Sequence, residues 1–181
     1  MDDDLKQEVR RAARGDKDAA RLLFDNYYPR VYRYAKSRVG SAEDAEDIAA
    51  ETFASVVRGL PSFKWKGGGF EAWLFRIAYN LIIDHYRTWE REQTAEYSFD
   101  EEDGRSPEVA FFEGELAKVL NEMLGSLSPD QRDVLLLRFA AELTTEEIAH
   151  VMHRKKNAIR QLQFRALETL RRHMHEELER Q

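Results

Sequence analysis

The most chemically distinctive stretch of this chain is PSFKWKGGGFEAWLFRIAYNLIIDHYR, from Pro61 to Arg87. Its first part interleaves two lysines with two aromatic residues and then places three glycines in a row, a composition that excludes regular structure. These four residues are Phe63, Lys64, Trp65 and Lys66. Lysines neutralise phosphates, and aromatic rings stack on unpaired bases or wall a pocket for an extruded base. We therefore predict a loop that binds single-stranded nucleic acid; a solvated connection is the alternative.

A helix is expected directly after the glycines, because apolar residues recur there at steps of three and four. The apolar stripe comprises Phe70, Trp73, Leu74, Ile77, Leu81 and Ile82, and the polar side comprises Arg76, Asn80, Asp84 and Arg87. The polar side can face DNA beside the loop. Phe70 and Trp73 lie on the apolar stripe, so core packing is expected for most of the surface of these two rings, and base contact is the alternative.

The composition excludes several classes of site. With 181 residues and a hydrophobic fraction of 43%, the chain can form one globular domain or two small ones. It has no cysteine, and its five histidines lack zinc-ligand spacing. Since no nucleophile and base pair or phosphate-binding glycine loop appears, we expect no catalytic residue, metal or cofactor, and hence no enzyme. The absence of a secretion signal or long apolar run predicts a cytoplasmic protein.

An acid-rich helix is predicted after Ser41, in AEDAEDIAAETFASVVRGL. Ser41 is a favourable N-cap, and Asp44 stands where the acid of a capping box is found. The apolar positions, Ile48 and Phe53 among them, form an inward face, while the acids crowd the outside. Such a surface suits a basic partner, and a solvated acidic face is the alternative. Upstream, we expect two helices over residues 2–38, with Pro29 kinking or restarting the second.

The chain changes character between Glu90 and Glu115. Ten acidic residues there oppose two arginines, a net charge of −8, and no apolar periodicity is present. This pattern predicts a flexible acidic linker over residues 91–114. Roughly 24 flexible residues would span about 27 Å, so the flanking parts could form separate domains.

The C-terminal part has the outline of a helix-turn-helix. Capping boxes are expected at Ser128 with Gln131 and at Thr144 with Glu147. A short helix from Thr144 would be followed by a turn at 153–155 and a long basic helix. Between residues 154 and 172 seven basic residues oppose one acid, a net charge of +6, so the overall charge of −6 conceals a basic DNA-reading helix.

Individual residues of that helix can be given distinct roles. Those spaced to approach base edges are Asn157, Arg160, Gln161 and Phe164, and those suited to phosphates are Lys155, Lys156, Arg165 and Arg171. Arginine and glutamine can each contact a base through two hydrogen bonds, which is the geometry that discriminates sequence. A merely solvated basic face is the alternative.

Taken together, these segments resemble the extracytoplasmic-function sigma factors of bacterial RNA polymerase. DAEDIAAETF resembles the polymerase-binding helix of that family, FEAWLFRIAYNLIIDHYR its strand-opening and promoter-reading segment, and LSPDQRDVLLLRFAAELTTEEIAHVM with AIRQLQFRALETLRR its C-terminal helix-turn-helix. The resemblance implies an all-α fold of two small helical domains joined by the acidic flexible linker. The first domain would occupy residues 1–90 and the second residues 115–181. Core RNA polymerase and promoter DNA are the implied partners, and an anti-sigma factor is a further one.

The resemblance also implies roles for the candidate residues. The residues implied to bind polymerase are Asp44, Asp47, Ile48, Glu51 and Phe53. Those implied to melt the promoter and contact the minus-ten element are Phe63, Lys64, Trp65, Lys66, Phe70, Trp73, Arg76, Asn80 and Arg87. Those implied to read the minus-thirty-five element are Lys155, Lys156, Asn157, Arg160, Gln161, Phe164, Arg165 and Arg171.

One departure from the family concerns the turn, where relatives usually carry glycine and this chain has His153. Histidine tolerates a left-handed backbone better than most residues, so we expect the turn to form. The alternative function is a free-standing helix-turn-helix regulator with an N-terminal oligomerisation or sensing domain. Transcription with core polymerase distinguishes the two, because a repressor produces no new start site.

Overall fold

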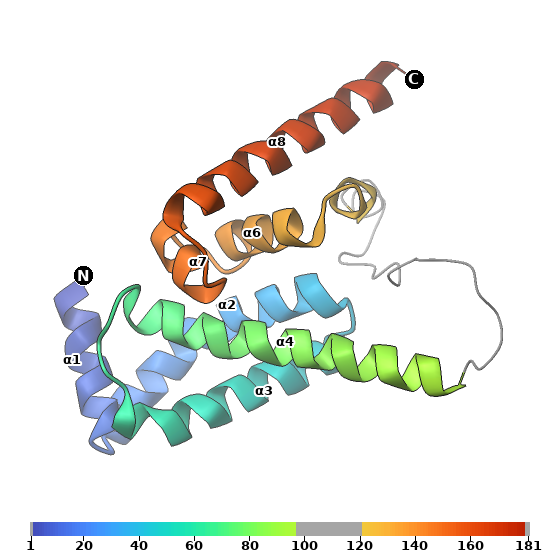
Figure 1. Cartoon of the computed structure of the whole chain (residues 1–181). Helices are drawn as coiled ribbons and strands as arrows, with labels where there is room; N and C mark the ends of the chain where they lie inside the picture. The colour runs from blue at the N-terminus through green and yellow to red at the C-terminus, as the bar shows by residue number, and fades with distance from the viewer. Residues whose placement is uncertain (1, 97–120, 180–181) are drawn as a thin grey trace.

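The computed structural model describes residues 2–96 and 121–179, and these residues form helices without strands (Figure 1). The first lobe contains α1 (Asp2–Ala13), α2 (Lys17–Val39), α3 (Ala42–Gly59), the short 3-10 helix η1 (Leu60–Ser62) and α4 (Gly69–Glu96). The second lobe contains helical residues 121–125, α6 (Pro129–Phe139), α7 (Thr145–Val151) and α8 (Lys156–Glu179). The predicted all-α fold of two helical domains is confirmed.

Most helix boundaries follow from local capping. Ser41 accepts a hydrogen bond from the Asp44 backbone N–H at 3.2 Å and begins α3 as predicted. Ser128 with Gln131 and Thr144 with Glu147 form complete capping boxes at the starts of α6 and α7. Each box pairs backbone N–H groups that a helix start would otherwise leave without partners.

Two segments differ from expectation. We expected Pro29 to kink or restart the second helix; α2 runs without a break from Lys17 to Val39 with Pro29 inside it, so the helix does not restart there. α4 runs to Glu96, so the first six residues of the expected linker are helical. The remainder of that linker, residues 97–114, lies outside the described residues.

The buried apolar side chains form one continuous cluster that includes residues of both lobes. In the first lobe, Tyr34, Leu74, Phe75 and Ile82 are fully buried where α2 and α4 meet, and the Tyr34 and Phe75 rings pack edge to face. In the second lobe, the fully buried residues include Val134, Leu137, Leu143, Ile148 and Ile159. These side chains pack α6, α7 and α8 together. Burial of this kind accounts for most of the stability of such helices.

The two lobes also pack against each other. α6 lies against α2, and α7 lies against the start of α4 (Figure 1). The Arg30 guanidinium on α2 donates to the backbone oxygen of Ala141 at 2.7 and 3.1 Å, and Arg33 pairs with Glu142 at 2.5 Å. The loop and helix that carry the candidate DNA-binding residues therefore lie beside α7 of the other lobe.

Candidate nucleic-acid interface

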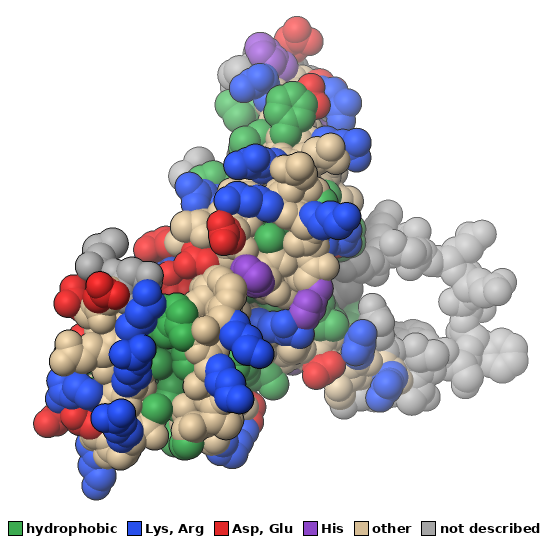
Figure 2. All heavy atoms as spheres, turned by 60° about the vertical axis from the view of Figure 1, so that its left-hand side comes forward, with side chains coloured by type: hydrophobic (Ala, Val, Ile, Leu, Met, Phe, Trp, Pro, Cys, Tyr) green, Lys and Arg blue, Asp and Glu red, His purple; other side chains and the backbone are tan. Residues whose placement is uncertain are grey.

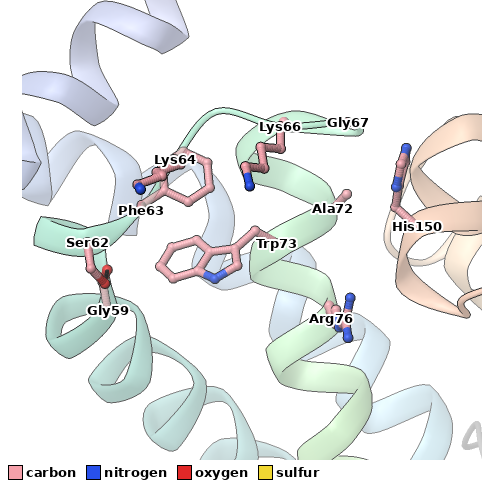
Figure 3. Close-up of a pocket in the computed structure, with 11 residues that line it drawn as sticks. Gly59, Ser62, Phe63, Lys64, Lys66, Gly67, Ala72, Trp73, Arg76 and His150 are labelled. Carbon is pink, nitrogen blue, oxygen red and sulfur yellow. Dashed lines mark hydrogen bonds between the residues drawn. The ribbon is translucent and has the colours of Figure 1, made fainter.

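The predicted base-binding loop forms one wall of a pocket of about 480 Å³ (Figure 3). Its lining residues are Gly59, Ser62, Phe63, Lys64, Lys66, Gly67, Gly69, Ala72, Trp73, Arg76 and His150. η1 and the loop supply one side, the first turns of α4 supply another, and α7 of the second lobe supplies His150. The volume is in the range of small-molecule sites.

An aromatic cluster shapes this pocket. The Phe63 and Trp73 rings lie 4.8 Å apart between centroids and tilt by 39°, and Phe70 packs edge-on to Phe63 at 6.0 Å. Gly59 permits the close approach of Trp73, because a Cβ atom at Gly59 would lie 2.9 Å from the indole ring. Phe63 and Trp73 therefore offer partly exposed apolar faces held by neighbours, which suits stacking of an unpaired base.

The charges around the pocket are positive. Lys64, Lys66 and Arg76 are exposed and line it, and among the described lining residues there is no aspartate or glutamate. Cations beside an aromatic wall can bind the phosphates that flank an inserted base. The structure thus brings together five of the residues predicted for the minus-ten element.

The other four predicted residues lie elsewhere. Phe70 is 1% exposed and packs in the core, so it positions the pocket wall and does not offer a face. Trp65 lies outside this pocket, with the Lys6 ammonium 5.4 Å from its ring centroid. Asn80 and Arg87 are exposed farther along α4. The place of Phe70 on the apolar stripe agrees with its burial, whereas no spacing in the sequence indicated the contact of Trp65 with Lys6 on α1.

The acidic helix α3 offers a mixed surface. Asp47 and Glu51 are exposed, and Glu51 accepts a hydrogen bond from Arg58 at 2.6 Å, which with the positive charge of Arg58 lowers the pKa of Glu51. Ile48 and Phe53 are buried, so they support the helix from inside. Asp44 is half-buried, with its carboxylate 3.9 Å from His85. The exposed part of the predicted polymerase-binding set is therefore acidic.

The second lobe forms the predicted helix-turn-helix. His153 adopts a left-handed backbone with φ of 53°, and the Arg154 N–H donates to the Ala149 oxygen at 3.0 Å, closing the turn. Arg154 also pairs with Asp130 on α6 at 2.5 Å, which ties the turn to the rest of the lobe. The expected survival of the turn with histidine in place of glycine is confirmed.

All eight residues predicted to read duplex DNA are exposed on α8 or the turn before it. Figure 2 shows Lys and Arg side chains spread along the upper part of the molecule, where α8 lies. Asn157, Arg160 and Phe164 share one side of α8, and Phe164 is 65% exposed. Lys156 differs from the other cations of this set, because its ammonium already forms an ion pair with Glu146 at 3.0 Å. Leu167, a large apolar residue of α8, is also exposed.

A buried ion pair joins the two lobes. Arg38 on α2 and Asp133 on α6 lie 2.9 Å apart, and their side chains are 7% and 5% exposed. Burial raises the pKa of Asp133, while Arg38 and a hydrogen bond donated by Tyr79 oppose that rise. Burial, and then the Asp133 charge, raise the pKa of Tyr79 to about 12. Sequence reasoning missed this pair and His150, since neither has a local signal.

Within the described residues, no group of acids and histidines is arranged to hold a metal ion. The same part of the chain contains no helix with the length and apolar character needed to cross a membrane.

Comparison with known proteins agrees with this two-lobe arrangement. Residues 23–92 match the family described as Sigma-70 region 2, and residues 123–172 match Sigma-70 region 4. BldN, an ECF RNA polymerase sigma factor of Streptomyces coelicolor, is 38% identical over 171 residues, which cover 93% of this chain and 65% of BldN. SigD of Mycobacterium tuberculosis, another ECF RNA polymerase sigma factor, is 31% identical, covering 92% of this chain and 82% of SigD.

A solved structure shows the same fold. The sigma factor RpoE of Bartonella quintana, in complex with the anti-sigma factor NepR, superposes with a TM-score of 0.66 at 24% identity, covering 84% of this chain and 94% of that chain. The two matched regions correspond to the first and second lobes, and the regions carry the candidate pocket and the helix-turn-helix. The chain belongs to the extracytoplasmic-function sigma factors, the family that directs bacterial RNA polymerase to promoters.

Proposed function

We propose that the two lobes of this sigma factor divide promoter recognition between them. The first lobe holds an unstacked base of the minus-ten element in the pocket walled by Phe63 and Trp73. The second lobe places α8 in the major groove of the minus-thirty-five element. The observation that carries this proposal is the pocket itself, which combines two partly exposed rings with three cations and contains no acid among its described lining residues.

Pocket chemistry supports a base more strongly than a small metabolite. A flipped base needs a π-face to replace the stacking that it loses, and its flanking phosphates need cations at the rim. Phe63 and Trp73 supply the aromatic faces, and Lys64, Lys66 and Arg76 supply the cations. We propose that the chain performs no catalytic step itself and acts in the cytoplasm, where bacterial RNA polymerase works.

Run-off transcription with purified core polymerase and genomic DNA tests the function as a whole. We expect new, discrete start sites when the chain is added to core enzyme. A free-standing regulator that used only its helix-turn-helix would bind DNA and produce no new start site. The same reactions identify the promoter sequence, because the start sites can be mapped and aligned.

A charge reversal on α3 tests the polymerase-binding surface. Asp47→Arg should weaken core polymerase binding by at least about tenfold, because an exposed carboxylate that faces a basic partner would be replaced by a like charge. Binding is measured by a pull-down titration against core enzyme. Asp3→Arg is the matched control, since it makes the same charge change on α1 at a position that is almost fully exposed. Equal retention of polymerase by both variants would remove Asp47 from this surface.

Truncation of one arginine on α8 tests base reading. Arg160→Ala should lose about 1 to 3 kcal/mol of discrimination at one base pair if the guanidinium makes two hydrogen bonds to that base. Competition binding against a panel of single-base variants of the upstream element measures the loss. Arg165→Ala serves as the control, because loss of a phosphate contact should weaken binding to every variant alike. An unchanged preference in Arg160→Ala would assign the reading to other residues.

An anti-sigma factor is a further proposed partner. RpoE of Bartonella quintana was solved with such a protein, and the present chain shares that fold. Co-purification from the native host, followed by loss of run-off activity when the captured protein is added back, is the test.

A further inference from the structure

Two of the three consecutive cations where α8 begins are already paired with acids of the second lobe. The Arg154 guanidinium donates to the Asp130 carboxylate at 2.5 Å, and the Lys156 ammonium donates to the Glu146 carboxylate at 3.0 Å. Asp130 lies in the first turn of α6, and Glu146 lies in the first turn of α7. Lys155, between the two paired cations, forms no ion pair with the described part of the chain. The start of α8 therefore carries less free positive charge than its sequence indicates.

The two ion pairs contribute little to the stability of the lobe. All four side chains are between 42% and 61% exposed, and in water the attraction of such a pair is nearly offset by the freedom that the side chains lose. An acid in the first turn favours the helix dipole, but that benefit does not require a cation opposite the acid. The hydrogen bond from Lys156, and then its charge, lower the pKa of Glu146, so this carboxylate is ionised at neutral pH. The purpose of the pairing is therefore better sought in DNA binding.

Both pairs lie where a helix-turn-helix meets DNA. The N-terminal residues of its second helix reach base edges in the major groove, and phosphates of both strands flank that place. A phosphate that approaches Arg154 or Lys156 must displace a carboxylate from the cation, and the same carboxylate repels the phosphate. Each pair should thus weaken a phosphate contact and reduce the number of counterions that binding releases.

Weaker phosphate contacts affect binding to random DNA more than binding to a matching site. Sequence-independent binding comes from the phosphates alone, and such a complex can shift along the duplex until its cations meet them. In the matching complex, base contacts proposed for Arg160 and Gln161 fix one orientation. A cation freed from its acid then gains a phosphate only if one lies at that place. The ion pairs therefore weaken a random complex more than a matching one.

We propose that Asp130 and Glu146 raise the sequence selectivity of the second lobe by competing with DNA phosphates for Arg154 and Lys156. This inference rests on the proposed function of α8. The basic residues farther along the helix attract DNA of any sequence, whereas the start of the helix adds little to that attraction. Base contacts then decide where the lobe stays bound.

Removal of the two acidic charges tests the proposal. Asp130→Asn with Glu146→Gln keeps the shape of both side chains and frees both cations. Fluorescence anisotropy measures binding of the full chain to a random-sequence duplex and to a duplex that carries the upstream element mapped by run-off transcription. At about 100 mM salt we expect binding about tenfold tighter to the random duplex and about threefold tighter to the matching one. The salt slope on the random duplex should steepen by about 0.9 for each freed cation.

Asp25→Asn is the matched control for the change in net charge. Asp25 pairs with Arg21 at 3.7 Å on the exposed surface of α2, so this variant also frees a cation, but on the first lobe. Its affinities and salt slope should equal those of the unmodified protein.

A double variant tests whether Glu146 acts through Lys156. In a Lys156→Ala background, Glu146→Gln should lose most of its effect on random DNA, because no paired cation remains to be freed. An undiminished gain in that background would overturn the competition described for this pair.

The possible outcomes separate this inference from the proposed function. Equal gains on both duplexes, no gain, or weaker binding would each overturn the role of Asp130 and Glu146 in selectivity; weaker binding would mean that the acids position the cations for contact. A damaged fold cannot produce the expected result, since the variant must bind more tightly. If the unmodified protein does not prefer the upstream element to random DNA, the proposed reading by α8 fails, and this inference fails with it.

Discussion

Replacing Phe70 with alanine should lower the free energy of unfolding by about 3 to 5 kcal/mol. Its ring is 1% exposed and packs against Tyr27 at 5.4 Å, Phe63 at 6.0 Å and Trp73 at 5.9 Å between centroids. Removal of the ring leaves a cavity between α2, the loop and α4, and the neighbouring rings lose the partner that holds them apart. Urea unfolding followed by circular dichroism measures the change.

Phe164→Ala is the matched control for that experiment, because the same atoms are removed from a ring that is 65% exposed. Its effect on unfolding should stay within about 0.5 kcal/mol. A loss below about 1 kcal/mol in Phe70→Ala would contradict the packing described here. The two variants should also differ in function: Phe70→Ala should weaken binding of single-stranded DNA by disordering the pocket wall, and Phe164→Ala should affect duplex DNA.

Binding of duplex DNA by the second lobe should depend steeply on salt. Four cations at the start and along the length of α8 are assigned to phosphates: Lys155, Lys156, Arg165 and Arg171. If each neutralises one phosphate, the logarithm of the binding constant falls with the logarithm of salt concentration with a slope of about −3.6. Affinity should then drop about 150-fold between about 50 and 200 mM salt. Anisotropy titrations of the full chain against an upstream-element duplex measure this slope.

Single substitutions separate the contributions to that slope. Lys155→Ala should reduce its magnitude by about 0.9 and weaken all sequences alike. Lys156→Ala should have a smaller effect, because its ammonium already pairs with Glu146 at 3.0 Å and releases fewer counterions on binding. A slope near zero for the unmodified protein, or no change in Lys155→Ala, would show that this face does not meet the DNA backbone. Arg160→Ala, by contrast, should change discrimination between sequences.

The local features of this protein were predictable because they depend on residues only a few positions apart. The capping boxes at Ser128 and Thr144, the start of α3 at Ser41 and the turn at His153 all involve neighbours within one or two helical turns. Their hydrogen bonds form almost independently of the rest of the fold. The exposure of the base-reading side of α8 followed from the same periodicity.

The candidate pocket was predictable in part. The pattern of lysines interleaved with aromatic residues singled out Phe63, Lys64 and Lys66, and the helix after it singled out Trp73; all four line the pocket. The burial of Phe70 agrees with its place on the apolar stripe. Trp65 lies in the loop before that stripe, and its contact with Lys6 depends on tertiary packing that no local pattern indicates.

The amino-acid sequence by itself determined the helices, their order, the helix-turn-helix and the opposite charges of α3 and α8, since each depends on composition or on near neighbours. Only the tertiary structure decided how the lobes meet. Arg38 and Asp133 are 95 positions apart, and each alone is compatible with a solvated surface. His150 likewise has no pattern that directs it to Gly67. Contacts of this range depend on the complementary shapes of two folded surfaces, which exist only after both lobes have formed.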